Sequence, residues 1–183
     1  MYNLTIAQVA YDVARTVCPL DSGIGTASSY TITDTSKSWE VNQWAGGSLF
    51  FGSPVSWSTV TTNTANTITS SETNSGTGAY TVTTNKVSPG IILQGVTSAL
   101  RNPNVGNTGS KPYDISNLNE PIAGVENYEL LSWLAVLNTL RLFLVITGND
   151  EPVMKELFNE ASTRVQALSS SPHTFTAGRL LGL

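Results

Sequence analysis

The chain has 183 residues, a formal net charge of −4 and a charged fraction of 12%, about half the roughly 25% of a typical globular domain. This length suits one domain, or one domain with an insertion. The nine basic residues are scattered, with no two adjacent. That distribution argues against tight binding of nucleic-acid phosphates by a monomer, which needs clustered Lys and Arg. A surface rich in hydroxyl groups and poor in charge favours packing against other proteins.

The N-terminal half of the chain holds two predicted helices. The first begins after Thr5, where a capping-box pattern precedes apolar residues at spacings of three and four, and it ends before Pro19. The second begins at Ser88, an N-cap with Pro89 at the first helical position, and ends near residue 101. Residues 19–30, which lie between the first helix and the β region, are predicted to form a loop.

The C-terminal half holds a predicted helical hairpin. Its first helix, 127–147, is apolar around most of its circumference, which is typical of a helix that is buried on several sides or completed by a neighbouring subunit. Gly148 is the predicted C-cap and Asp150 caps the next helix, whose apolar stripe runs to Leu168. A long irregular stretch, 102–124, precedes the hairpin.

The middle of the chain has strand character. From Trp57 to Ser88, 16 of 32 residues are Ser or Thr. Such a biased composition also occurs in disordered segments, but regularly placed large side chains favour an ordered antiparallel sheet. The strand candidates are 30–33, 48–51, 55–60, 66–70 and 79–84, with a short element at 39–47 and a turn at 73–78.

We therefore predict an α+β protein. Residues 1–29 and 88–168 form a helical body of about four helices, and residues 30–87 form an inserted Ser/Thr-rich antiparallel β meander or small barrel. Residues 169–183 form an extended C-terminal arm, which stays ordered only where it docks.

The sequence contains no motif that predicts catalysis, a metal or a cofactor. His173 is the only histidine and lies in the arm, away from any predicted rigid element. Cys18 is the only cysteine, which excludes an intrachain disulfide, and we interpret it as a small apolar residue at a helix end. Glu156 and Glu160, one helical turn apart, are interpreted as a solvated face. A glycosidase pair of two carboxylates distant in the sequence stays open.

Three tryptophans of the β region, Trp39, Trp44 and Trp57, have two interpretations. They form a core, which we favour for large aromatic residues in a small sheet, or a platform on which sugars stack. Two further features bear on location. The first residues, 1–5, lack the basic and apolar regions of a signal peptide. The apolar stretch 130–146 carries Arg141, so a buried or interface helix is favoured over a membrane span.

The helical framework resembles a known family over about half of the chain. The matching parts are the short N-terminal helix, the segment Ile-Ile-Leu-Gln-Gly-Val-Thr-Ser-Ala-Leu-Arg at 91–101 and the long loop that follows it. The hairpin completes the pattern, with Glu-Leu-Leu-Ser-Trp-Leu-Ala-Val-Leu-Asn-Thr-Leu-Arg at 129–141, Thr-Gly-Asn-Asp at 147–150 and Leu-Phe-Asn-Glu-Ala at 157–161. This pattern resembles the head-to-tail connector (adaptor) proteins of tailed bacteriophages, including the tail-tubular type. The large β insert departs from the most compact members.

The resemblance implies a structural, non-enzymatic virion protein of the neck or tail region, assembled in the host cytoplasm. It implies a homo-oligomeric ring, commonly of twelve subunits, between the portal protein and the tail or nozzle proteins, with the genome DNA passing through and no membrane contact. The arm would reach the portal, and the expected interface residues are Phe175, Arg179, Leu180, Leu181, Leu183, Trp133, Leu137 and Arg141. The alternative is a β-module appendage, either a receptor- or glycan-binding protein or a capsid decoration protein.

Overall fold

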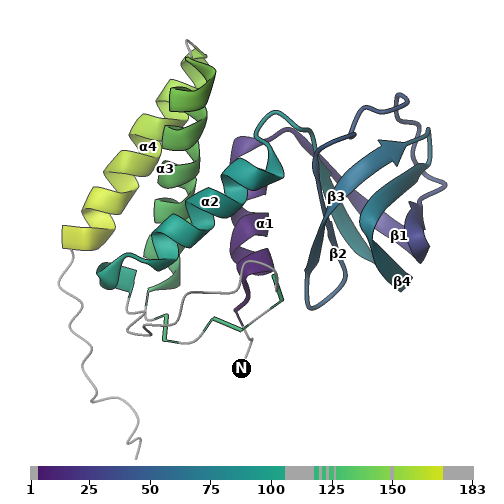
Figure 1. Ribbon diagram of the computed structural model, residues 1–183, viewed down its shortest axis with the longest axis horizontal. Coiled ribbons are helices and arrows are strands. Elements are labelled where there is room, and N and C mark those ends of the chain that lie inside the picture. Colours follow the sequence, from purple (N-terminus) through teal and green to yellow (C-terminus); the bar gives the residue numbers. More distant parts are fainter. Residues whose placement is uncertain are drawn as a thin grey trace, which may run out of the picture.

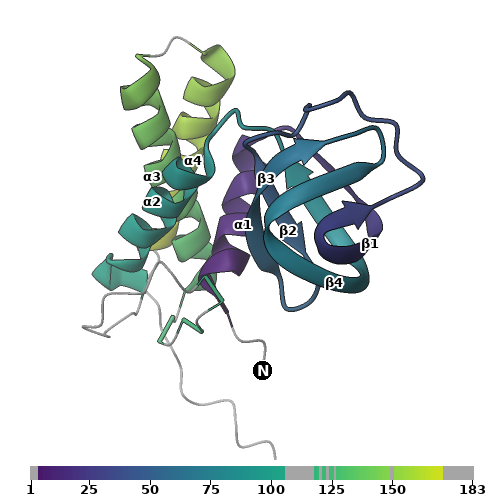
Figure 2. The ribbon, with the colours of Figure 1, turned by 45° about the vertical axis from the view of Figure 1, so that its right-hand side comes forward.

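A computed structural model describes residues 4–105, 118, 119, 121, 122, 124, 125, 127–148 and 151–170. In this part of the chain it has four α-helices and a four-stranded antiparallel sheet, so the α+β class is confirmed. Figure 1 shows the sheet at one end, α1 and α2 beside it, then α3, and α4 on the side away from the sheet. Figure 2, turned by 45°, again shows the sheet on one side of the molecule and the helices on the other, with α1 next to the sheet.

The helices begin and end where the capping residues predict. Helix α1 spans Ile6–Val17, and the Thr5 hydroxyl accepts a hydrogen bond from the Gln8 amide. Helix α2 spans Pro89–Leu100 and has Ser88 as its N-cap. A short 3-10 turn, η1, follows at Pro103–Val105.

The two helices of the hairpin have different environments. Helix α3, Tyr128–Thr147, begins after Asn127 and ends at Gly148, whose φ of 61° lies in the left-handed region that glycine adopts without strain. Helix α4, Pro152–Ser170, buries only Met154 and Ala161 among its described residues. It extends two residues into the segment assigned to the arm, and the rest of the arm, 171–183, lies outside the described residues.

The sheet consists of β1 (Leu20–Thr33), β2 (Ser48–Phe51), β3 (Ser56–Asn63) and β4 (Thr67–Thr83). The strand order is β1-β4-β2-β3: β4 pairs antiparallel with β1 and with β2, β2 pairs with β3, and β3 also pairs with the start of β4.

Two of the local predictions in the β region are wrong. The loop expected at 19–30 is mostly the first eleven residues of β1, and the turn expected at 73–78 lies inside β4. These two stretches pair with each other, with Gly25 opposite Gly78 and Ala27 opposite Gly76. Two glycines of the first stretch, Gly23 and Gly25, are needed for close contacts. A Cβ at Gly23 would lie 2.4 Å from Asp34 Oδ2.

The sheet and the helices share a hydrophobic core. Phe50 of β2 and Trp57 of β3 belong to the buried cluster of the helices, and their rings stack with centroids 5.7 Å apart. Tyr11 of α1 meets Phe50 edge-on at 5.3 Å. The opposite face of the sheet has its own buried cluster, which includes Leu49 and Ile68. Phe50 and Leu49 are neighbours in β2, so the alternation of side chains along a strand supplies both cores.

Candidate interaction surfaces

The interface residues predicted on α3 lie on one face of that helix. Trp133, Leu137 and Arg141 are spaced four residues apart, so their side chains lie one above another. Trp133 is half-buried, and the Arg164 guanidinium of α4 lies 5.5 Å from its ring centroid. Leu137 packs partly against the helical core, and Arg141 is exposed. The other predicted interface residues, Phe175, Arg179, Leu180, Leu181 and Leu183, lie outside the described residues.

An exposed apolar patch, which we call the tip patch, lies where α3 ends and α4 begins. It consists of Val145, 75% exposed, Ile146, 64% exposed, and Val153, 67% exposed. Val145 continues the face of Trp133, Leu137 and Arg141 by one more turn. The sequence did not single out these residues because α3 is apolar all round, and the pattern does not show which of its ends is left uncovered.

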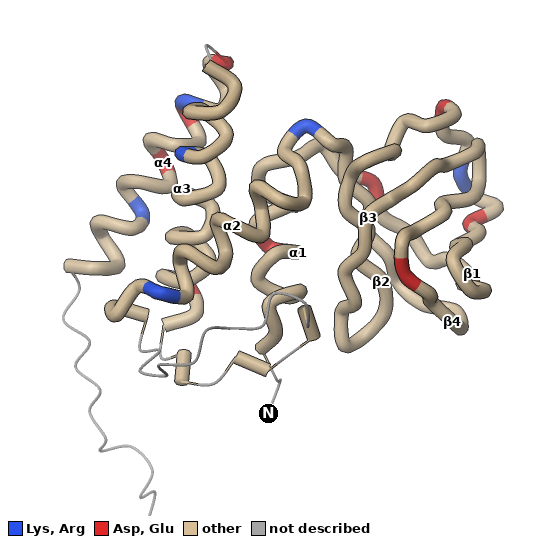
Figure 3. Tube along the Cα trace, in the orientation of Figure 1, with Lys and Arg blue, Asp and Glu red and all other residues tan. Residues whose placement is uncertain are grey.

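The charged side chains are few and dispersed (Figure 3). The closest ion pairs in the described chain join Lys37 to Asp21, at 2.7 Å, and Lys86 to Glu151, at 2.8 Å. Within the described ranges, no group of three or more His, Cys, Asp and Glu side chains could hold a metal ion. His173 lies outside them.

Cys18 is buried and its Sγ lies 3.8 Å from the Val87 carbonyl oxygen, to which it donates. Burial raises the pKa of this thiol, against a smaller opposing effect of Lys86. A raised pKa keeps the thiol protonated and unreactive, in agreement with the interpretation of Cys18 as a small apolar residue.

A buried carboxylate, Asp34, organises the turn after β1. It accepts hydrogen bonds from the Ser36 hydroxyl at 2.6 Å, the Ser36 amide at 3.0 Å and the Tyr80 hydroxyl at 2.7 Å. The Ser36 hydroxyl lowers the pKa of Asp34, burial opposes this, and Tyr80 lowers it further. Burial, followed by the hydrogen bond to Asp34, raises the pKa of Tyr80. Asp34 is therefore charged and Tyr80 neutral at pH 7, which makes this pair a structural clasp.

A second carboxylate, Asp21, joins the start of β1 to the same turn. It accepts from Lys37 Nζ and from the Trp39 indole, both at 2.7 Å. Burial acts to raise the pKa of Asp21, but the hydrogen bonds from Lys37, Trp39 and the Ser22 amide outweigh it and lower the pKa.

All three tryptophans of the sheet are buried, with exposed fractions of 9% for Trp39, 4% for Trp44 and 7% for Trp57. This agrees with core packing. A sugar stacks on an exposed ring face, and none of these three side chains presents one.

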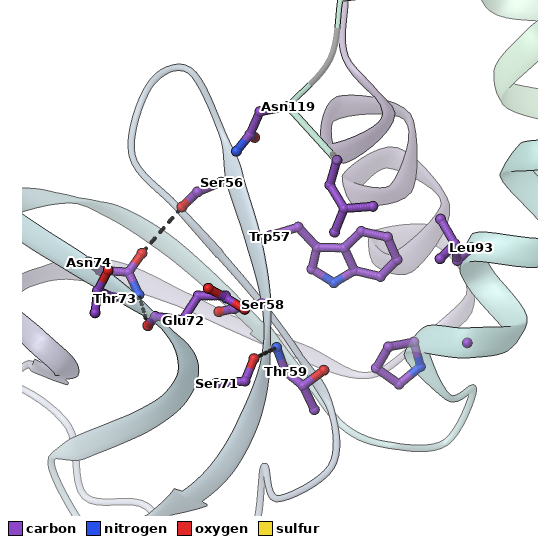
Figure 4. A pocket seen from close by; sticks show the side chains of 13 residues that line it. Ser56, Trp57, Ser58, Thr59, Ser71, Glu72, Thr73, Asn74, Leu93 and Asn119 are labelled. Carbon is purple, nitrogen blue, oxygen red and sulfur yellow. Dashed lines mark hydrogen bonds between the residues drawn. The ribbon is translucent and has the colours of Figure 1, made fainter. Parts of the chain in front are cut away.

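A groove of about 500 Å³ lies between the sheet and the N-terminal end of α2. Ser56, Ser58, Ser71 and Thr73 from β3 and β4 are among the residues that form its polar side (Figure 4). The facing side carries the apolar residues Pro89, Leu93 and Leu118. Among the described residues that line the groove, Glu72 is the only charged one.

The groove lies where the regular pairing of β4 with β1 is interrupted by a bulge. Thr31 of β1 pairs with Thr69 of β4, and Ser29 pairs with Asn74, so one residue of β1 stands opposite four of β4. A bulge of this kind terminates pairing and redirects side chains. The Asn74 amide group holds it by donating to Ser70 Oγ at 3.1 Å. The sequence does not reveal this groove, since it depends on a change of register between distant strands.

Comparison with protein-family models, with curated proteins and with solved structures finds no match. Within the described residues, α3 is long and apolar enough to cross a membrane by length and composition, and 44% of that stretch is buried inside the protein. An apolar helix covered by other helices has the same properties.

Proposed function

We propose that this protein is a structural subunit of the head-to-tail connector of a tailed bacteriophage, and that it assembles into a homo-oligomeric ring between the portal and the tail. By the resemblance, the ring has twelve subunits and gives the genome DNA a passage. The observation that supports this proposal most directly is the tip patch of Val145, Ile146 and Val153 on the hairpin.

The apolar surface of the hairpin suits a permanent partner. Helix α4 has two buried residues among the 19 that it contains, so one protomer covers it on one side only. Exposed apolar side chains that gather at one place mark interaction sites more often than scattered ones do. A neighbouring subunit packed against the hairpin would bury the tip patch and the face of Trp133, Leu137 and Arg141.

The charge of the chain agrees with a DNA passage. The net charge is −4, and the described basic residues are dispersed (Figure 3). A channel wall without basic clusters does not hold phosphates, so the DNA can slide.

The test is the mass of the assembled protein. The full chain is purified alone and with a portal protein, and its mass is measured by native mass spectrometry and its shape by negative-stain microscopy. We expect closed rings in at least one condition. The double variant Val145→Ser/Ile146→Ser should assemble at least tenfold less well. The control Val41→Ser removes an apolar side chain that is 72% exposed on the sheet side and should assemble like the wild type.

Two results would contradict the proposal. One is a protein that stays monomeric at micromolar concentration with and without portal protein. The other is ring formation by the tip variant at the wild-type level, which would show that the hairpin is not the interface.

A further inference from the structure

The edge of β3 that faces the groove has no strand beside it in the described chain. Residues 56–59 pair with β2 on one side, whereas the pairing of β3 with β4 begins only at Val60. The Val60 amide donates to the Gly47 carbonyl, next to β2, and the Thr59 amide points the other way, to Ser71 Oγ at 3.1 Å. Amides of a strand alternate between its two edges, so the Trp57 amide also faces the groove.

The groove also contains an unpaired donor. Trp57 Nε1 is buried and has no hydrogen-bond partner among the described residues, and Trp57 as a whole is 93% buried, that is, 7% exposed. Figure 4 shows its indole between Leu93 and the hydroxyl side chains of β3. A buried N–H group without an acceptor costs about 1–3 kcal/mol, and a small turn of the indole would be needed to bring this one to a carbonyl group of an occupant.

An extended peptide fits these features better than a sugar. A strand added to a free edge gains main-chain hydrogen bonds, and its side chains point alternately to the two walls. Here one wall is polar and the other is apolar. A sugar would need an exposed aromatic face, but the Trp57 ring stacks on Phe50 and is buried.

The tail of this chain has the matching chemistry. Residues 171–183 follow α4 and contain Thr174-Phe175-Thr176, which alternates polar and apolar. Arg179 is the only formally charged side chain of this segment at pH 7, and Glu72 is the only charged residue among the described residues of the groove. Thirteen extended residues span roughly 45 Å, enough to reach from one subunit to the next.

We propose that the groove binds residues 171–183 of a second copy of this chain as an added β-strand along residues 56–59. A copy is favoured as the donor because α4, which precedes the tail in the sequence, lies on the side of the helices away from the sheet (Figure 1). Donor and acceptor surfaces on opposite sides of a subunit form a heterologous contact, which makes a ring where the rotation between subunits closes and a filament where it does not. The inference rests on the proposed function only in that the copies are ring neighbours, and it gives the tail a partner other than the portal.

The test is a disulfide cross-link between two full-length variants. One carries Thr73→Cys at the groove and the other carries Thr176→Cys in the tail. Cys18 is 7% exposed and does not compete. After mixing and mild oxidation, non-reducing electrophoresis should show the mixed dimer. In the control pair Thr35→Cys, an exposed residue that does not line the groove, replaces Thr73→Cys, and we expect at least tenfold less dimer.

Blocking the groove should prevent the cross-link. A Cβ added at Gly90 has no atom within 4 Å, so Gly90→Phe can fill the groove without disturbing α2. Ser98→Phe places the same side chain on an exposed position of α2 outside the groove. We expect the cross-link to fall at least fivefold with Gly90→Phe and to stay unchanged with Ser98→Phe. A synthetic peptide of residues 171–183 in excess should compete in the same way.

The pairing of charges gives a reciprocal test. Glu72→Lys and Arg179→Glu should each lower the cross-link about threefold, since an exposed ion pair contributes up to about 1 kcal/mol, and the two together should restore it. A mixed dimer no more abundant than in the control pair overturns the inference, as does a link that forms only within one chain carrying both cysteines. If rings form without the cross-link, the proposed function stands and this inference fails. If the cross-link forms without rings, this inference stands and the proposed function fails.

Discussion

The sheet and the hairpin of α3 and α4 differ in the kind of side chain they carry and in how those side chains are covered. The sheet is rich in hydroxyl groups, and buried polar side chains such as Asp34, Ser70 and Asn74 find hydrogen-bond partners within it. The hairpin is apolar and leaves large side chains exposed at its tip. The sheet therefore meets many of its polar requirements within one protomer and leaves the β3 edge at the groove free, whereas the hairpin leaves apolar side chains uncovered at its tip. A partner subunit is expected at the hairpin for this reason.

The largest expected effect tests whether the two regions are one folding unit. Trp57→Ala removes a ring that the sheet contributes to the helical core, and truncations of this size cost about 3–5 kcal/mol. Chemical denaturation followed by far-UV circular dichroism and by fluorescence of the remaining tryptophans should show one transition at lower denaturant. Two separate transitions would mean that the sheet and the helices unfold independently.

The next effect concerns the packing of α2 on α3. A Cβ at Gly95 would lie 2.0 Å from Thr139 Oγ1 and 2.8 Å from the Thr139 backbone nitrogen. Gly95→Ala should therefore cost about 2–3 kcal/mol, as overpacking does. Gly90→Ala, on the same helix, meets open space and should stabilise by about 0.5 kcal/mol, because alanine is the better helix former. Thermal unfolding of both variants measures the contrast, and equal effects would contradict the close approach.

A smaller effect tests the clasp of Asp34 in the sheet. Its pKa is lowered in the folded state, so its contribution to stability is present above the unfolded pKa of about 3.9 and is lost as pH falls through the folded value. The free energy of unfolding should therefore drop below about pH 4 in the wild type and drop less in Asp34→Asn. At pH 7 this variant should be less stable by about 1–2 kcal/mol. Parallel pH curves would show that another carboxylate is responsible.

The smallest expected effect on stability belongs to the tip patch. Ile146→Ser should change the free energy of unfolding of the monomer by less than about 0.5 kcal/mol, since exposed substitutions rarely do more. The same change should weaken self-association, measured by sedimentation velocity. Loss of monomer stability by more than 1 kcal/mol would mean that Ile146 is packed within its own protomer.

The sequence predicted the helices well because their ends are marked locally. Thr5, Ser88, Asn127 and Gly148 each act within a few residues of the helix that they cap. The sheet was predicted less completely. The start of β1 and the middle of β4 are rich in Gly and Ser, and their strand structure depends on pairing across about 50 residues.

Of the candidate surfaces, one could be predicted from the sequence and two could not. The spacing of Trp133, Leu137 and Arg141 is visible in the sequence and places them on one helix face. The tip patch depends on which side of α3 other helices cover, and the groove depends on the register of β4. Both are properties of the tertiary structure, and a local pattern does not contain them.

The two connections between the sheet and the helices have a mechanical consequence. They leave the sheet from neighbouring strand ends, where Leu20 pairs with Thr83, and the Thr84 amide donates to the Pro19 carbonyl at 3.0 Å. A single connection would let the sheet swivel, whereas two connections bonded side by side resist rotation about either one. A load applied to the sheet is thus passed to α1 and α2 together. In the proposed ring, the sheet of each subunit would therefore keep a fixed direction relative to its helices.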